Sequence, residues 1–270
     1  MDIAPPTTGT GDGTVGKALD VLDMVALHSR PVRFSELLAD GRFPKATLYR
    51  LLQTLTNQGM LAYDPDRQGY APGMRLVRLA HSAWRQSSLA PVARPHLDEL
   101  AALVGETVHL AQLDTGQVLY VDKRNARQPV EMFSQAGKVG PAYCTGVGKA
   151  MLAFLDEGEL ARALTRQSFH RFTQQTLASP TELRAELKMI RERGHALDRE
   201  EHEPGIICVA LPILMQGNRM LGALSVTSTT ERTSLSALEA LVPKIKETAA
   251  RIAAASECWR FPERDTKGGR

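Results

Sequence analysis

The chain has 270 residues, 43% of them hydrophobic and 23% charged, with a formal net charge of +3 at pH 7. These values suit a globular protein of one or two domains, and they exclude a chain that is strongly basic or acidic as a whole. No apolar stretch reaches the roughly 18 residues of a membrane span, and the first residues lack the basic and apolar regions of a signal peptide. We therefore expect a cytoplasmic protein with no membrane partner.

Residues 1–14 are rich in Gly, Thr and Pro and nearly free of apolar side chains, so we predict a disordered tail there. From Val15 to Ala26 the apolar residues recur on one helical face, and Pro31 marks the end of that helix. The stretch SELLAD predicts a short second helix with Ser35 as its N-cap, followed by a glycine turn.

The next segment, FPKATLYRLLQTLTNQG, has the pattern of a third helix that begins near Pro44 and stops at Gly59. Its buried side consists of Leu48, Leu51, Leu52 and Leu55. After it, MLAYDPDRQGYAPG predicts two short strands around a DPDRQG turn. Helix, helix, turn, helix and hairpin within residues 15–73 is the order of a winged helix-turn-helix domain.

The polar side of this third helix carries side chains that suit the major groove of DNA. It presents Lys45, Thr47, Arg50 and Gln53. Arginine reads guanine and glutamine reads adenine. Residues 30–85 hold nine Arg and Lys against four Asp and Glu, which makes the segment locally basic. A small helical domain in which Arg50 is an ordinary solvated charge is the alternative that the pattern alone leaves open.

Residues 74–88 continue as a helix, which we interpret as a linker between two domains. Beyond it, further helices are predicted at 93–105, 183–194 and 235–256, and hairpins at 107–124 and 207–228, with DTG and QGN at their turns. Helices packed on an antiparallel sheet make an α+β domain, which we predict for residues 89–258 with a flexible tail at 259–270.

The stretch CTGVGKAML looks like part of a nucleotide-binding loop, but two positions exclude that function. A phosphate loop needs G-x-x-x-x-G-K-[ST], and this chain has Tyr143 at the first glycine and Ala150 at the hydroxyl position. We interpret the stretch as a glycine turn that opens a helix, whose free amide groups can face a small anion. Two alternatives remain: Gly146 and Gly148 only make a tight turn, and Lys149 pairs with an acidic neighbour.

Cysteine spacing and the acidic run DREEHE argue against metal and catalytic sites. Cys144, Cys208 and Cys258 lie far apart without a C-x-x-C pair, so neither a disulfide framework nor a cysteine-rich zinc site is expected. The acidic run lacks regular ligand spacing, and we interpret it as a solvated turn in which Asp198, next to apolar residues, is a candidate to point inward. We expect no metal, no cofactor and no catalytic residue.

Three separated groups of motifs together resemble the IclR family of bacterial transcriptional regulators over residues 15–258. They are FPKATLYRLLQTLTNQGML with the wing YAPGMRL, then GVGKAMLAFL, then LRAELKMIRERGHALDREEHEPGIICVALPI with GALSVTSTTERTS. The resemblance implies a DNA-binding repressor or activator, usually a dimer that pairs into a tetramer. It also implies a GAF-like C-terminal domain that binds a small metabolite, often a carboxylate or an aromatic acid.

The same resemblance implies the site residues. DNA would be contacted by Arg42, Lys45, Thr47, Tyr49, Arg50, Gln53, Arg67 and Gln68. The effector pocket would be lined by Met132, Gly146, Val147, Asp198, Ile206, Cys208, Ser225 and Thr227. Amide groups near Gly146 and the hydroxyls of Ser225 and Thr227 would hold a carboxylate, while apolar side chains wrap its body. Tyr143 and Cys144 replace the usual His and small residue, so we expect an altered pocket entrance.

We therefore predict a ligand-responsive DNA-binding regulator, in its simplest form a repressor, whose homodimer reads a palindromic operator and pairs into a dimer of dimers. The effector would change DNA affinity through the linker helix. One alternative is an enzyme that acts on a small metabolite in the C-terminal pocket, with Cys144 as its nucleophile. Another is an adaptor that uses its winged helix on protein, which the salt dependence of binding separates from DNA recognition.

Overall fold

The computed structural model describes residues 13–87 and 89–257. Contacts within the chain divide it into two compact units, with the boundary between Ala83 and Trp84. This boundary lies inside helix α4 (Met74–Ser87), the segment predicted to be a linker helix. The chain therefore passes from one unit to the other along a helix.

The two predicted tails fall mostly outside the described residues. The N-terminal tail is predicted two residues too long, because Gly13 and Thr14 already belong to the first turn of a helix. Within the described part of the chain, no helix is both long and apolar enough to cross a membrane.

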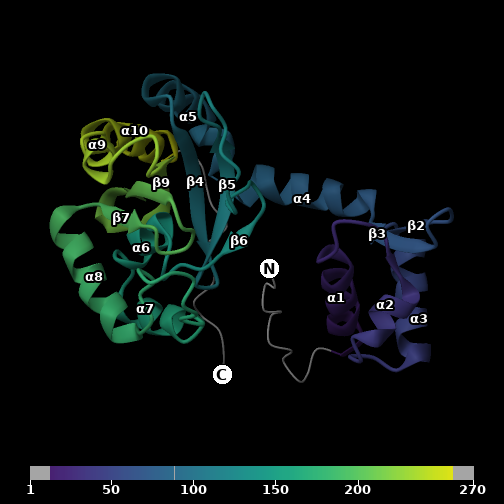
Figure 1. The fold of residues 1–270 in the computed structure, drawn as a ribbon. Helices are drawn as coiled ribbons and strands as arrows, with labels where there is room; N and C mark the ends of the chain where they lie inside the picture. The colour runs from purple at the N-terminus through teal and green to yellow at the C-terminus, as the bar shows by residue number, and fades with distance from the viewer. Residues whose placement is uncertain (1–12, 88, 258–270) are drawn as a thin grey trace. The chain divides into compact units, whose positions relative to one another are not determined.

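The N-terminal unit packs three helices and a small sheet around one apolar core (Figure 1). The helices are α1 (Gly13–Ala26), α2 (Phe34–Ala39) and α3 (Lys45–Asn57), and the strands are β1 (Val32–Arg33), β2 (Leu61–Asp64) and β3 (Gly69–Pro72). The strands are antiparallel in the order β1-β3-β2, so the predicted hairpin gains one short strand that the sequence analysis missed. The predicted order of helices and hairpin is otherwise confirmed.

Helix α2 begins two residues earlier than the predicted Ser35 cap implies, and its cap is different. Arg33 is the N-cap residue, while Ser35 lies inside the first turn. The carboxylate of Glu36 accepts hydrogen bonds from the backbone N–H of Arg33 at 2.9 Å and from the guanidinium of Arg30 at 3.1 Å. The hydrogen bond from the Arg30 guanidinium, and to a smaller extent that from the Arg33 N–H, lowers the pKa of Glu36 to about 2. A glutamate in the first turn thus holds the helix start that was assigned to a serine.

The C-terminal unit is built on a six-stranded sheet in the order β6-β5-β4-β9-β8-β7, with every neighbouring pair antiparallel. The strands are β4 (Thr107–Asp114), β5 (Gln117–Arg124), β6 (Val139–Gly140), β7 (Ala196–Arg199), β8 (Ile206–Leu214) and β9 (Met220–Thr229). Both predicted hairpins are present, with Gly116 and Gly217 at positive φ in their turns. The α+β class with an antiparallel sheet is confirmed.

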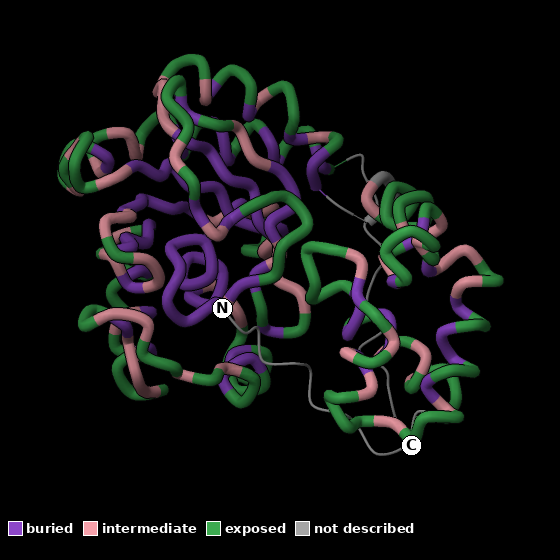
Figure 2. Tube along the Cα trace, turned by 45° about the vertical axis from the view of Figure 1, so that its right-hand side comes forward, coloured by how far each residue is buried: buried purple, intermediate pink, exposed green. Residues whose placement is uncertain are grey.

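Helices cover both faces of this sheet (Figure 1). One face packs against α5 (Ala90–Val104), α9 (Leu235–Glu239) and α10 (Val242–Ala255), and the other against α6 (Gly146–Leu152), α7 (Glu157–Leu164) and α8 (Pro180–Arg193). Each face has its own cluster of buried apolar side chains, and buried stretches run through the middle of the unit in Figure 2. The sheet is therefore the central layer of three.

The closing segment is two helices and not the single helix that was predicted. α9 ends at Glu239 and α10 begins at Val242, with Pro243 in its first turn. Proline has no N–H to donate, and its ring excludes the carbonyl group four residues earlier, here that of Glu239. One helix therefore ends before the proline, and a second helix begins with the proline in its first turn.

Candidate functional site

The outer face of α3 is the first candidate surface. Leu48, Leu51, Leu52 and Leu55 are buried, which leaves the opposite face of the helix in solvent. That face carries Tyr49, Arg50 and Gln53, all exposed, and the amide of Gln53 donates a hydrogen bond to the Tyr49 hydroxyl at 3.2 Å. Arg42 and Lys45 are exposed at the helix start, where Arg42 pairs with Asp40 at 2.9 Å.

Thr47 is the exception among the predicted DNA-contacting residues on this helix. It is half-buried, whereas Arg50 is exposed. The reason is helical geometry, because Thr47 lies four residues before the buried Leu51 and three before the exposed Arg50, and so between the two faces. Thr47 therefore lies at the edge of the polar face, and its contact with DNA stays a prediction.

The hairpin tip between β2 and β3 presents the other predicted residues. The carboxylate of Asp64 accepts hydrogen bonds from the backbone N–H groups of Asp66 at 3.0 Å and Arg67 at 3.1 Å, which fixes the turn. Gln68 follows with φ of 50°, and both Arg67 and Gln68 are exposed. Two polar side chains therefore project from a tip whose backbone is held in place.

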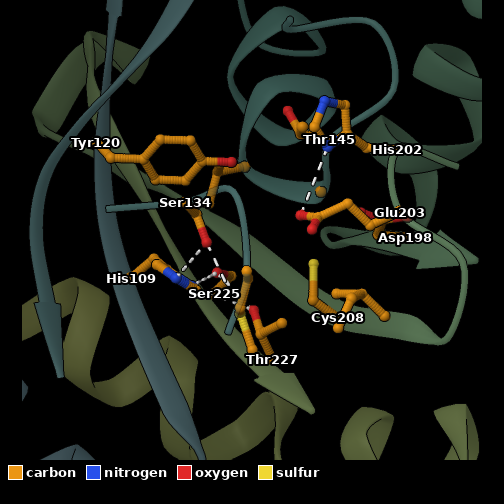
Figure 3. A pocket seen from close by; sticks show the side chains of 14 residues that line it. His109, Tyr120, Ser134, Thr145, Asp198, His202, Glu203, Cys208, Ser225 and Thr227 are labelled. Carbon is orange, nitrogen blue, oxygen red and sulfur yellow. Dashed lines mark hydrogen bonds and ion pairs between the residues drawn. The ribbon is translucent and has the colours of Figure 1, made fainter. Parts of the chain in front are cut away.

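The second candidate site is a cavity in the C-terminal unit, between one face of the sheet and the first turn of α6 (Figure 3). Its walls enclose about 390 Å³, the open mouth included. All eight residues of the predicted effector pocket line it: Met132, Gly146, Val147, Asp198, Ile206, Cys208, Ser225 and Thr227. The fold brings these distant residues together, and their role in binding an effector stays a prediction.

Six further residues complete the wall and were missed by the sequence analysis: His109, Tyr120, Ser134, Thr145, His202 and Glu203. His109 lies on β4, where it pairs in register with Ser225 of β9. A histidine between the apolar Val108 and Leu110 of this strand was the available signal. The other side chains come mostly from irregular segments, whose course the sequence pattern does not predict.

His109 is the centre of a polar cluster on one wall. Its Nε2 lies 2.8 Å from the Ser134 hydroxyl, and its Nδ1 lies 3.3 Å and 3.4 Å from the hydroxyls of Thr227 and Ser225 (Figure 3). Burial, followed by the positive charge of Lys123, lowers the pKa of His109 to about 3. The ring is therefore neutral at physiological pH, and this wall offers hydrogen bonds without a net charge.

Asp198 stands on another wall, where β7 pairs it in register with Cys208 of β8. It is 7% exposed, and its carboxyl accepts a hydrogen bond from the backbone N–H of Glu201 at 2.9 Å. Burial, followed by the nearby charge of Glu201, raises the pKa of Asp198 to about 7.

The two glycines of GVGK are required for close packing. A Cβ on Gly146 would lie 2.3 Å from the Cys208 sulfur, and one on Gly148 would lie 2.4 Å from the carbonyl oxygen of Ala142. Neither Gly146 nor Gly148 has a positive φ, so neither is required for a left-handed turn. The alternative of a plain tight turn is therefore wrong, since the lack of a side chain brings α6 against the sheet.

Lys149 is wholly buried and does not reach the cavity. Its ammonium group donates to the carbonyl oxygen of Leu197 at 2.7 Å and forms an ion pair with Glu201. The alternative in which this lysine pairs with an acidic neighbour is confirmed. The pair ties α6 to the end of β7, and so holds Gly146 and Asp198 on adjoining walls.

Tyr143 and Cys144 do not line the cavity, so the expectation that they alter its entrance is wrong. The Tyr143 ring packs 5.1 Å from that of Phe169, and its hydroxyl donates to the carbonyl oxygen of His170 at 2.6 Å. Both residues are fully buried in the apolar cluster around α6. Burial, followed by the charges of Asp198 and Glu201, raises the pKa of the Cys144 thiol, whereas a nucleophilic cysteine needs a lowered one. The enzyme alternative thus has no support in this residue.

The described residues include no group of three or more His, Cys, Asp and Glu side chains positioned to hold a metal ion. A winged helix-turn-helix unit followed by an α+β unit with a partly enclosed polar cavity defines a class of protein, the transcriptional regulator with its own ligand-binding domain.

Comparisons with known proteins agree with this class. Residues 14–65 match the IclR helix-turn-helix domain, and residues 81–254 match the C-terminal domain of the bacterial transcriptional regulator IclR. The HTH-type transcriptional regulator XynR of Escherichia coli is 33% identical over 219 residues, which cover 81% of this chain and 87% of that protein. The IclR regulator of Alicyclobacillus acidocaldarius has a solved structure with a TM-score of 0.76 and 28% identity, covering 90% of this chain and 98% of that one.

An IclR homologue from Microbacterium hydrocarbonoxydans, solved in complex with 4-hydroxybenzoate, shares the fold with a TM-score of 0.76 at 22% identity, over 90% of this chain and 98% of its own. The chain belongs to the IclR family of bacterial transcriptional regulators, as the sequence motifs predicted. Its N-terminal unit is the helix-turn-helix domain of such a regulator, and its C-terminal unit is the effector domain.

Proposed function

We propose that the protein is a cytoplasmic, homodimeric repressor, paired into a dimer of dimers, that reads a palindromic operator and senses a small carboxylic or aromatic acid. One observation carries the effector part of this proposal: eight residues spread from Met132 to Thr227 meet at one cavity in the effector domain. The DNA part rests on the exposed polar face of α3 and on the wing tip at Arg67. The proposed role is sensing and not catalysis, and it includes no metal or cofactor.

The cavity has the chemistry to hold a compact acid. The neutral cluster of His109, Ser225 and Thr227 offers hydrogen bonds to a carboxylate, and the first amide groups of α6 lie on the adjoining wall. Apolar Met132 and Val147 give the body of the ligand a dry surface. A protein of the same fold binds 4-hydroxybenzoate, which makes that acid a suitable first probe.

Thermal unfolding with added acids tests the effector proposal. We expect 4-hydroxybenzoate, benzoate or lactate to raise the melting temperature, because a ligand that binds only the folded state stabilises it. Replacement Thr227→Val removes one hydroxyl with little change of shape and should abolish the rise. Thr181→Val, at an exposed position on α8, is the matched control and should keep it. A rise that survives Thr227→Val would place the acid outside this cavity.

Replacement Arg50→Ala should weaken operator binding by about 1–3 kcal/mol and relax the sequence preference at one position, because arginine on an exposed recognition helix reads a base. The operator is obtained by selecting bound duplexes from a random pool, and affinities are measured by gel shift. Arg67→Ala, at the wing, should instead weaken binding to all duplexes alike. It should also reduce the slope of log affinity against log salt concentration by about one, the value of one lost phosphate contact.

The exposed Arg251 of the effector domain supplies the matched control, and Arg251→Ala should bind the selected duplex like the parent protein. If Arg50→Ala keeps both affinity and sequence preference, α3 is not the element that reads the operator.

A further inference from the structure

We propose that Asp198 enters the effector complex as a neutral carboxylic acid that donates a hydrogen bond to the ligand carboxylate. Above neutral pH the free protein holds Asp198 as a carboxylate. Binding of one ligand molecule is therefore accompanied by transfer of one proton from solvent to a carboxylate oxygen of Asp198. No other bond forms or breaks. This inference rests on the proposed function and specifies how the cavity accepts an anion and how pH regulates the sensor.

The cavity lacks the usual partner of an anion. Among the described residues that line it there is no lysine and no arginine, whereas Asp198 and Glu203 both contribute carboxyl groups. Glu203 already has partners: both its oxygens accept from the backbone N–H of Phe133, at 3.1 Å and 3.2 Å, and one lies 3.6 Å from Nδ1 of His202. An anionic ligand beside an ionised Asp198 would meet a like charge with no lysine or arginine among the described lining residues to offset it.

The nearest buried cation is committed elsewhere. The ammonium group of Lys149 bonds to Glu201 and to the carbonyl oxygen of Leu197. Even so, the second carboxylate oxygen of Glu201 is buried without a hydrogen-bond partner. One cation therefore faces two buried carboxyl groups three residues apart, and Asp198 is the one that it does not contact.

Six ionisable groups on the elements packed around Asp198 influence its charge. They are Lys149 of α6, Glu201 and His202 of the turn after β7, Cys208 of β8, Cys144 ahead of α6, and Tyr120 of β5. Burial raises the pKa of both thiols and of the Tyr120 hydroxyl, so these three groups are uncharged near neutral pH. Together, burial and these groups raise the pKa of Asp198 to about 7, so its carboxyl group can take up a proton near neutral pH when a ligand binds.

His109 is not a substitute source of positive charge. Its pKa is lowered to about 3, so a proton placed there near neutral pH is unfavourable. Protonation of Asp198 removes the repulsion and also creates a donor aimed at the anion. A carboxylic acid kept neutral by a buried site is a known way of binding a negative oxygen.

Calorimetric titration of the full chain with benzoate and lactate tests the proposal, in two buffers of different ionisation enthalpy, from about pH 5.5 to 9. We expect affinity to be flat below about pH 6 and to fall tenfold per pH unit above about pH 7, since the complex needs a proton that the free protein has lost. At high pH the binding enthalpy should differ between the two buffers by the amount that corresponds to uptake of one proton per acid bound. At low pH it should be the same in both buffers.

The replacement Asp198→Asn is the decisive variant, because an amide donates to a carboxylate at any pH and still accepts from the Glu201 N–H. It should bind with an affinity that does not change with pH. The control His170→Gln, at an exposed histidine that is not among the lining residues, should keep the slope of the parent protein. A parent protein with flat affinity and no proton uptake overturns this inference and leaves acid sensing intact. A slope that persists in Asp198→Asn also overturns it. If neither acid binds even at pH 5.5, the proposed acid site is wrong and the inference falls with it.

Discussion

Replacement of Lys149 by methionine should lower the free energy of unfolding of the C-terminal unit by about 3–5 kcal/mol. The lysine is wholly buried, and its partner Glu201 is 3% exposed. Without the ammonium group, the Glu201 carboxylate would be left buried beside Asp198 with no compensating charge. Desolvation of an unpaired ion is the reason that breaking a buried pair costs far more than breaking one in water. Urea unfolding followed by circular dichroism measures the change.

Two further variants show whether the pair is the cause. The double replacement Lys149→Met with Glu201→Gln removes both charges and should be more stable than the sum of the two single losses predicts. Arg251→Met breaks a surface ion pair with Glu99, in which the side chains are 44% and 59% exposed, and should cost at most about 1 kcal/mol. A cost for Lys149→Met no larger than that of Arg251→Met would mean that the buried pair contributes nothing to stability.

Replacement Gly146→Ala should destabilise the effector domain by about 2–3 kcal/mol and abolish acid binding, because the new methyl group has no room. Its carbon would lie 2.3 Å from the sulfur of Cys208, and α6 must then move away from β8. Since Gly146 forms the cavity wall together with Cys208, the same movement displaces the first amide groups of the helix. Thermal unfolding with and without 4-hydroxybenzoate measures both effects.

The clash can be relieved at its source. In Gly146→Ala with Cys208→Ala the sulfur is gone, and the next neighbours of the methyl group are Ala210 at 3.4 Å and Asp198 at 3.6 Å, which are acceptable contacts. This double variant should recover most of the stability. Gly148→Ala is the matched control, since its methyl group meets backbone atoms of Ala142 and should not respond to Cys208→Ala. Equal stability of Gly146→Ala with and without Cys208→Ala would contradict the packing argument.

Local patterns were enough for most of the secondary structure. The amphipathic period of α3 and the turn residues of the hairpins act between neighbours in sequence, so they can be read before any fold is known. The errors have two causes: pairing with a strand elsewhere in the chain, and local contacts that the pattern does not reveal. Strand β1 forms because Val32 pairs with Tyr70 of β3. Arg33 and not Ser35 is the N-cap of α2, where the Glu36 carboxylate accepts hydrogen bonds from the Arg33 N–H and from Arg30.

The candidate site shows the same division. The family motifs predicted eight residues around the cavity, but the motifs could not say which other side chains would face them. His109 meets Thr227 across 118 positions of the chain, a contact that follows from the pairing of β4 with β9. Ser134 and Glu203 come from irregular segments, which carry no period for a pattern to reveal.

The sequence by itself determined the family, the order of the elements and the polar outer face of α3, because each depends on residue type at fixed local spacing. Only the tertiary structure decided the chemistry of the cavity. Lys149 and Glu201 meet across 52 positions, and their pairing leaves Asp198 without an ion pair in the described part of the chain. The physical reason is burial: the charge state of a group depends on which neighbours replace water around it, and those neighbours are chosen by the packing of the whole domain.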